Sequence, residues 1–529
     1  MMYDILIRNG KIVDGTGNPW FRGDIGIKDG RIVKISKISP DAEAKQVIDA
    51  RGMVVSPGFI DIHSHSDLPL LVDGLAQGKV RQGVTTEVIG NCGFTLAPLM
   101  SKMAKEDLKN ELEEFGLELN WETMDEYLNL LQKQGVSLNV VPLIGHGIIR
   151  KSVMNYDKRK ASNEEIKKMR QLVRECMEAG AFGITTGLIY PPSCYADLDE
   201  LVDLAKVVAH YGGFYATHMR NESAELYQAV EESIDIGRRV GLPVQISHHK
   251  VCQPDHWGEV DRTLKLMHRV RNDEGLDVTC DVYPYIATAT GLSAVIPEEY
   301  HEGGKEKLLA HLKDPATRKI LLSILETQQG PRGWHNLFIS SVKTEKNRTA
   351  EGKDVQTLAK ERGISPADVV IDLLIEEELA VGMIRFAMCE DDVVRVLTDD
   401  LAMVGSDGGA LAIDGPLAKG KPHPRNFGTF PRVLGKYVRE EGVLTLEKAV
   451  QKMTSMPAAR LGLMQKGILR EGLDADITIF DPATVKDMAD FKNPLQYPVG
   501  IFHVIVNGTI VVQNGEHTGK KPGKVLRKS

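Results

Sequence analysis

The chain has 529 residues, of which 42% are hydrophobic and 26% are charged, so it is long enough for a large core and more than one domain. Its net charge of -8 argues against nucleic acid or an anionic membrane as the main partner. It has no run of about eighteen apolar residues, so no transmembrane helix is expected. The N-terminus lacks a signal-peptide pattern, and the six cysteines are scattered, which is typical of reduced thiols in the cytoplasm.

The two ends of the chain predict one small β domain. Residues 1–55 contain short strand-like runs separated by Asn-Gly and Asp-Gly pairs, which are typical of hairpins. Residues 475–481 and 501–512 have the same character. Because neither end alone can bury a sheet face, we expect residues 1–55 and 466–529 to form a small β-sandwich-like domain together.

The central region, residues 56–465, alternates apolar strand candidates with helical patterns such as 163–180, 197–211 and 224–240. Such alternation is typical of βα units around a parallel sheet. The strand candidates are 54–62, 85–89, 138–144, 182–186, 214–218, 244–248, 277–283 and 402–406. Their number favours an α/β fold of the TIM-like (β/α)8 barrel type. The long stretch before the last candidate predicts an inserted subdomain at about 287–345.

Metal-competent side chains follow most of these strands. They are His63 and His65 after the first, Cys92 after the second, His146 after the third, His218 after the fifth, His248 after the sixth and Asp407 after the eighth. The chemistry of such barrels lies at the carboxyl ends of the strands. Each residue alone has a structural explanation, as a core, loop or turn residue. Their common position predicts a metal site.

The ligand types indicate which ion this site prefers. Side chains two residues apart on a strand share one face, so His63 and His65 can converge on one ion. Imidazole nitrogens with a thiolate suit zinc, whereas magnesium and calcium prefer oxygen ligands. A catalytic zinc activates water at neutral pH. Asp407 is then predicted to take the proton of that water and to pass it to a leaving group.

Several motifs resemble a known family. The start 58–65, the split β domain, the histidines after strands five and six, and the aspartate after strand eight resemble the amidohydrolase superfamily. More narrowly, nearly the whole chain is similar to the N-acyl-D-amino-acid deacylases, through residues 90–93, 217–222, 247–250, 281–285, 405–408 and 423–430. Many superfamily members carry a carboxylated lysine after strand four. This chain has none there, and Cys92 matches the cysteine of the deacylase branch.

The resemblance implies a ligand set and a reaction. It implies a tight zinc held by Cys92, His218 and His248, and a second, weaker site formed by His63, His65 and Asp407. The reaction would be hydrolysis of the amide bond of N-acyl-D-amino acids, with Asp407 as general base and acid. The small-molecule substrate carries an α-carboxylate, for which Lys250, Tyr283 and Arg425 stand at the matching positions. His146 is expected to contact the substrate or its oxyanion.

Several points stay open at this level. Ala289 stands where relatives often carry serine, which favours an apolar substrate side chain slightly. A cyclic-amide hydrolase of the dihydroorotase or hydantoinase type is the nearer alternative, and a scaffold protein without activity is the remote one. The acyl group, the number of metals at work and the oligomeric state are not predicted.

Overall fold

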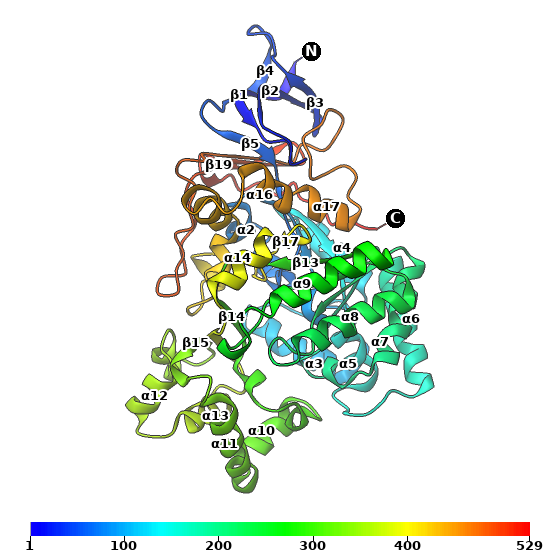
Figure 1. Cartoon of the computed structure of the whole chain (residues 1–529), viewed down its shortest axis with the longest axis vertical. Coiled ribbons are helices and arrows are strands. Elements are labelled where there is room, and N and C mark those ends of the chain that lie inside the picture. Colours follow the sequence, from blue (N-terminus) through cyan, green and yellow to red (C-terminus); the bar gives the residue numbers. More distant parts are fainter. Residues whose placement is uncertain (1, 529) are drawn as a thin grey trace.

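The computed structural model describes residues 2–528, and it divides into three parts along its longest axis (Figure 1). A β domain lies at one end, a barrel in the middle and a mainly helical insertion at the other end. No helix within residues 2–528 combines the length and apolarity needed to cross a bilayer.

The β domain is one hydrogen-bonded sheet that takes strands from both ends of the chain. Its strands are β1 (Tyr3–Ile12), β2 (Phe21–Lys28), β3 (Arg31–Ser36), β4 (Ala44–Asp49), β5 (Val54–Pro57), β18 (Ile477–Phe480), β19 (Ile501–Val506), β20 (Thr509–Gln513) and β21 (Glu516–His517). The order is β21-β20-β19-β18-β5-β1-β2-β3, with β4 paired to β1. Strand β5 joins the halves, since it pairs with β1 in parallel and with β18 antiparallel.

Both ends also share one apolar core in this domain. Ile7 and Ile25 from the N-terminal strands pack in the same buried cluster as Ile477 and Ile505 from the C-terminal strands. Burial of these side chains is the main source of stability for such a sheet. Each end of the chain therefore supplies part of one shared core.

The central part is a (β/α)8 barrel, which confirms the predicted fold class. Its strands are β6 (Phe59–Asp61), β7 (Val84–Ile89), β8 (Asn139–Pro142) with β9 (Ile144–Gly145), β10 (Gly183–Gly187), β11 (Phe214–His218), β12 (Val244–Ile246), β13 (Val278–Val282) and β17 (Ala402–Val404). All neighbouring pairs among them are parallel. Strands β8 and β9 are separated by Leu143 alone, whose amide donates to the carbonyl of Ile89.

The first and last strands meet just beyond their ends. The amide of Asp407 donates to the carbonyl of His63 at 2.7 Å, and the amide of His65 donates to the carbonyl of Gly408 at 3.0 Å. These bonds close the barrel at the edge where the predicted metal ligands lie.

The predicted first strand, 54–62, is divided between two sheets. Strand β5 belongs to the β domain and β6 to the barrel, with Gly58 between them. A Cβ atom at Gly58 would lie only 2.1 Å from Oγ1 of Thr85, so the close passage of the two segments requires glycine. A continuous apolar run does not reveal such a division.

Helices surround the barrel (Figure 1). They are α1 (Asp67–Val72), α2 (Gln77–Val80), α3 (Lys102–Glu113), α4 (Met124–Gln134), α5 (His146–Met154), α6 (Asn163–Glu178), α7 (Leu198–His210), α8 (Leu226–Val240), α9 (Val260–Arg269), α14 (Glu390–Thr398), α15 (Arg425–Arg432), α16 (Leu446–Met453) and α17 (Ser455–Leu461). The predicted helical patterns correspond to α6, α7 and α8. Helix α6 begins at a capping box in which Ser162 and Glu165 satisfy each other's backbone amides.

The insertion has a small antiparallel sheet and its own core. It contains β14 (Ala287–Gly291), β15 (Leu337–Val342), β16 (Val381–Phe386), α10 (Lys305–Lys313), α11 (Pro315–Gln329), α12 (Val355–Arg362) and α13 (Pro366–Glu376). Its buried cluster runs from Leu292 to Met383. The segment is longer than the predicted 287–345, because β16 is the central strand that pairs with both β14 and β15.

Candidate metal centre

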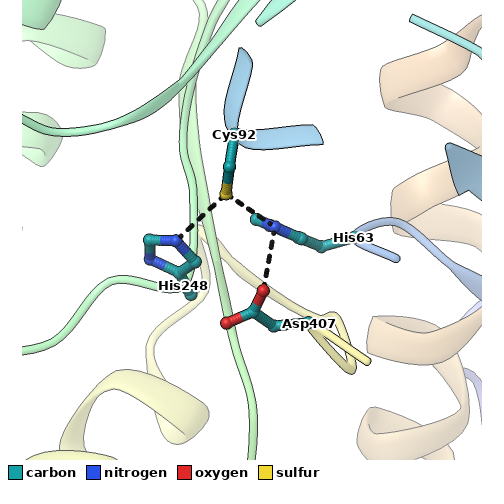
Figure 2. A group of neighbouring side chains, drawn as sticks. All are labelled: His63, Cys92, His248 and Asp407. Carbon is teal, nitrogen blue, oxygen red and sulfur yellow. Dashed lines mark hydrogen bonds and ion pairs between the residues drawn. The ribbon is translucent and has the colours of Figure 1, made fainter. Parts of the chain in front are cut away.

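Four buried side chains converge from separate strand ends of the barrel (Figure 2). They are His63, Cys92, His248 and Asp407, and their ligand atoms all lie within 4.8 Å of one another. Sγ of Cys92 is 3.3 Å from Nε2 of His63 and 3.4 Å from Nε2 of His248. Oδ1 of Asp407 is 3.4 Å from Nε2 of His63.

Three of these residues have a left-handed backbone. The φ angles are 52° at Cys92, 36° at His248 and 51° at Asp407. This region is costly for residues with a Cβ atom, and such conformations concentrate at functional sites. The backbone is bent at three strand ends, and the three side chains point to one place.

Asp281 fixes the orientation of His63. Oδ1 of Asp281 lies 3.1 Å from Nδ1 of His63 and accepts a hydrogen bond from the amide of His248 at 2.8 Å. Its other oxygen accepts from the side chain of Gln245. A carboxylate on Nδ1 is the usual way to hold a histidine whose Nε2 binds a metal. In this structure Nε2 of His63 faces Cys92 and Asp407.

His218 and Glu222 form a second group with His248. Nε2 of His218 is buried, has no hydrogen-bond partner among residues 2–528, and lies 3.8 Å from Oε2 of Glu222. Nδ1 of His248 lies 3.1 Å from Oε1 of Glu222. A buried polar atom without a partner is unfavourable, so the unpartnered nitrogen of His218 fits a site that binds an ion.

The charges of the cluster favour its ligand forms. Burial opposes ionisation of the Cys92 thiol, but the imidazoles of His63 and His248 outweigh it and hold the pKa of Cys92 well below its usual value. The thiolate is the form that binds metal. Nitrogen and thiolate donors with one carboxylate fit zinc, as predicted.

Asp407 lies between the metal ligands and a guanidinium. Its Oδ1 is 2.9 Å from Nε2 of His65, and its Oδ2 is 2.8 Å from a terminal nitrogen of Arg425. Burial raises the pKa of Asp407, but Arg425 and His248 outweigh this effect and hold it well below the usual range. Asp407 is therefore an ionised carboxylate that is available as a base.

The three residues predicted for a substrate carboxylate lie on one cavity beside the cluster. The cavity has a volume of about 1240 Å³, and Lys250, Tyr283 and Arg425 all line it. Nζ of Lys250 is 2.6 Å from Oε1 of Glu222, and the guanidinium of Arg425 lies 4.9 Å from the ring centre of Tyr283. Two cations and a phenol are thus presented together next to the candidate ligands.

His146 has a different place from the one predicted for it. It is fully buried and does not line the cavity. Its Nδ1 is 2.6 Å from Oγ of Ser193, and its Nε2 is 2.9 Å from Oε1 of Glu200 on α7. Because His146 begins helix α5, its ring turns outward to α7 and both nitrogens are occupied. The structure therefore replaces the predicted substrate contact with a buried hydrogen-bond network.

Sequence reasoning missed three residues of the site. Asp281 and Glu222 stand inside the motifs that carry the family resemblance, but their roles depend on contacts to distant histidines. Tyr190 follows the fourth strand, where its ring centre lies 5.0 Å from that of His218. Its hydroxyl is 3.0 Å from that of Thr290, so it joins the barrel to the insertion. Only its position after a strand end pointed to it.

The fold and the site together define a class of protein. A (β/α)8 barrel with buried histidine, cysteine and aspartate side chains at its carboxyl edge is the architecture of a metal-dependent hydrolase.

Comparison with known proteins gives the family. The model of the Amidohydrolase family matches residues 46–512. Among curated proteins, the chain is 39% identical to D-aminoacylase of Alcaligenes xylosoxydans xylosoxydans, over 100% of this chain and 98% of that one. It is 36% identical to the N-acyl-D-glutamate deacylase of the same organism, over 99% and 96%. The chain belongs to the amidohydrolase family, in its N-acyl-D-amino-acid deacylase branch.

Solved structures agree with this assignment. N-acyl-D-glutamate deacylase from Bordetella bronchiseptica, in complex with zinc and a phosphonate inhibitor, has a TM-score of 0.84 and 34% identity, with 100% of both chains covered. A D-aminoacylase structure has a TM-score of 0.83 and 36% identity, with 99% and 100% covered. L-hydantoinase from Arthrobacter aurescens, at 17% identity and a TM-score of 0.56, shares the fold alone.

Proposed function

We propose that the protein hydrolyses the amide bond of N-acyl-D-amino acids with zinc as its metal, releasing a carboxylate and a free D-amino acid. The observation that carries this proposal is the placement of two groups on one cavity. The cluster of His63, Cys92, His248 and Asp407 lies beside the cationic side chains of Lys250 and Arg425. An amide to be cleaved next to an α-carboxylate fits this arrangement.

Cys92, His218 and His248 would hold the tighter zinc, and His63, His65 and Asp407 a second, weaker one. Two facts of the chain support two adjacent positions. Sγ of Cys92 is about equally far from Nε2 of His63, at 3.3 Å, and of His248, at 3.4 Å, so it stands between them. Nε2 of His218 is buried without a protein partner among the described residues. A solved D-aminoacylase has a binuclear metal centre, with activation by one metal and attenuation by the second.

The mechanism follows from the side chains around the cluster. Bound zinc supplies a Lewis acid that polarises the amide carbonyl and makes water a stronger acid. Asp407 accepts a proton from the attacking water while the water oxygen forms a bond to the carbonyl carbon. The same carboxyl then gives that proton to the nitrogen as the carbon–nitrogen bond breaks, so the amine leaves neutral. The pairing of Asp407 with Arg425 keeps it ionised before each cycle.

The substrate's α-carboxylate is oriented by the cavity wall. The guanidinium of Arg425 can grip a carboxylate through two parallel hydrogen bonds, and Lys250 adds a point charge. The hydroxyl of Tyr283 supplies a further donor from the same wall. With three donors in fixed places, the scissile carbonyl of only one enantiomer lies against the metal cluster.

The enzyme is proposed to work in the cytoplasm. All six cysteines are free, and four of them are buried. A reducing compartment keeps such thiols in the form that Cys92 needs.

The test is a panel of N-acetyl-D- and N-acetyl-L-amino acids, assayed with zinc-loaded protein and with an Asp407→Asn variant. We expect release of amine from the D compounds and a loss of kcat of about 10²–10⁴ in the variant, because the amide side chain cannot carry the proton. The exposed Asp273→Asn serves as the matched control. Selectivity for L compounds, or full activity of Asp407→Asn, would contradict the proposal. Preference for ring-opening of hydantoins or dihydroorotate would favour the cyclic-amide alternative.

A further inference from the structure

Two arginines on the cavity wall have no acidic partner among residues 2–528. Arg385 lies on β16 directly opposite Thr288 on β14, and Arg332 lies just before β15 at the exposed rim. Residues paired across two antiparallel strands share one face of the sheet. Arg385 and Thr288 both line the cavity, as do Met383 and Thr290 two pairs further along. This face of the insertion sheet is therefore turned to the substrate space.

Every other lysine or arginine on this cavity has a carboxylate partner within the protein. Arg220 pairs with Glu232 at 3.0 Å, Lys250 with Glu222 at 2.6 Å, Lys305 with Glu378 at 3.3 Å and Arg425 with Asp407 at 2.8 Å. Glu298, the remaining acid that lines the cavity, pairs with Lys158 at 3.2 Å.

Arg332 and Arg385 are the exception. No carboxylate oxygen of residues 2–528 lies within 4.0 Å of either guanidinium. Arg332 contacts the neutral side chain of Gln253, whose amide accepts from Nε at 2.9 Å when its oxygen is turned toward the guanidinium. The guanidinium of Arg385 donates no hydrogen bond to any of the described residues. The wall thus carries two positive charges that the protein itself does not balance.

A cation such as Arg385, which is half-buried and has no counter-ion among the described residues, is unfavourable. Burial, and then the charge of Arg332, lower the pKa of Arg385 to about 10. Placing two guanidinium groups near each other in a partly dry cavity costs free energy unless an anion joins them. A bound carboxylate offsets this cost, and its affinity then depends on the arginines.

Both arginines lie close to the segment that follows Lys250. The amide of Gln253 donates to the carbonyl of Ala387, two residues after Arg385, at 2.8 Å, and the side chain of Gln253 contacts the guanidinium of Arg332. Cys252 also lines the cavity. One anionic group can therefore bind at Lys250 and Arg425 while a second lies at Arg385.

We infer that Arg385, assisted by Arg332, binds a second carboxylate of the substrate, so that the enzyme prefers N-acyl-D-amino acids that carry two carboxylates. This inference rests on the proposed function. The second carboxylate belongs either to the amino-acid side chain, as in glutamate, or to a dicarboxylic acyl group, as in succinyl. The inference replaces the slight preference for apolar side chains that Ala289 suggested, because the loss of one hydroxyl contact matters less to a carboxylate than two guanidinium groups.

The test compares substrates that differ in one charge. The panel holds N-acetyl-D-glutamate, its neutral counterpart N-acetyl-D-glutamine, N-acetyl-D-methionine and N-succinyl-D-methionine. We expect kcat/KM to be at least tenfold higher for a dicarboxylate than for its neutral counterpart. A preference for the glutamate compound places the anion on the side chain, and a preference for the succinyl compound places it on the acyl group. Equal values for each charged and neutral pair would overturn the inference.

Variants of Arg385 test whether the preference for dicarboxylates arises at this wall of the cavity. Arg385→Gln should remove most of the preference by raising KM for the dicarboxylate, while kcat/KM for N-acetyl-D-methionine changes by less than about threefold. Arg385→Lys should restore part of it. Arg348→Gln, an exposed residue of the same insertion that pairs with Glu345, is the matched control. An unchanged glutamate-to-glutamine ratio in Arg385→Gln would refute the role of Arg385.

The results distinguish a failure of the second anion site from a failure of the deacylase proposal, on which this inference rests. Turnover of N-acetyl-D-methionine without any charge preference leaves the deacylase proposal intact and removes the second anion site. If no compound is hydrolysed, the deacylase proposal fails. In that case, the binding of N-acetyl-D-glutamate and N-acetyl-D-glutamine to wild type and to Arg385→Gln is measured by calorimetry. Equal affinities of the wild type for the two compounds would overturn the inference.

Discussion

Cys92 has the most central place among the side chains of the metal centre. Its thiol contacts Nε2 of both His63 and His248, and its own backbone is left-handed. The two imidazoles that lower its pKa are themselves candidate ligands, so the ionised thiol and the ligand set depend on each other. A thiolate here neutralises one charge of a divalent ion and draws the two histidines to a common point.

We expect Cys92→Ala to lose its tightly bound zinc. Removal of the thiolate takes away one of three proposed ligands and the anion among them, and the affinity of a three-ligand site falls steeply with one ligand gone. Zinc content after gel filtration, measured by mass spectrometry, reports the loss without reference to activity. Cys389→Ala, a half-buried thiol away from the cluster, is the control. A full equivalent of zinc in Cys92→Ala would exclude this residue as a ligand.

Strand β7 of the barrel carries an ionisable side chain in a buried position. All six of its residues are buried, and among them is the carboxyl of Glu87. Oε2 of Glu87 accepts a hydrogen bond from Ser66 at 2.7 Å, whereas Oε1 has no partner among the described residues. Burial raises the pKa of Glu87 to about 7.

Glu87→Gln should therefore stabilise the protein above pH 7 but not near pH 5. The folded-state pKa exceeds the ordinary 4.5, so between these values the native state binds more protons than the unfolded state. Stability due to this group is present below pH 4.5 and falls as the pH rises to about 7. The amide keeps the bond to Ser66 without the charge, and we expect a gain on the order of 1–3 kcal/mol at pH 8.

Urea unfolding of wild type and Glu87→Gln at pH 5 and pH 8 measures this effect. Glu164→Gln, an exposed residue of α6, controls for the change of one charge. A loss of stability in Glu87→Gln at pH 8 would mean that the carboxylate is favourably solvated or paired, contrary to the structure.

At the scale of the whole molecule, the C-terminal segment links the β domain to the barrel. Beyond the β domain, the C-terminal segment runs along the barrel, where the amides of Gly523, Leu526 and Lys528 donate to the carbonyls of Val136, Val140 and Gly180. The amide of Val140 donates back to Lys524. The last residues therefore tie strand β8 and the turn before β10 to the β domain.

We expect deletion of residues 523–529 to lower stability without changing the chemistry. The four backbone bonds and the contacts of Arg527 to Asp125 and Ala179 are lost, and each net hydrogen bond is worth about 1 kcal/mol. Thermal unfolding should show a Tm lower by several degrees, while kcat of the folded enzyme at 25 °C stays the same. Arg527→Ala measures how much of the lost stability is due to the Arg527 side chain, and the remainder is due to the backbone hydrogen bonds. An unchanged Tm would show that the segment is not held in solution.

The barrel could be predicted from sequence because its strands are apolar runs that end in chemically distinct residues. His63, Cys92, His248 and Asp407 lie together at one edge because parallel strands bring their carboxyl ends together, and this can be expected from strand order alone. The place of His146 cannot be expected in this way, because its ring direction is set by the first turn of α5. Arg385 belongs to no motif, and its significance lies in an absent partner, which only three-dimensional coordinates reveal.

The left-handed backbone at Cys92, His248 and Asp407 affects the order in which the protein folds and binds its metal. Each such conformation is unfavourable by about 1–3 kcal/mol, and an unfolded chain relaxes to ordinary backbone regions. The donors come from widely separated parts of the chain, and the closing bonds of the barrel run through Asp407 itself. We therefore expect the donors to come together only once the barrel has closed, with metal loading after folding.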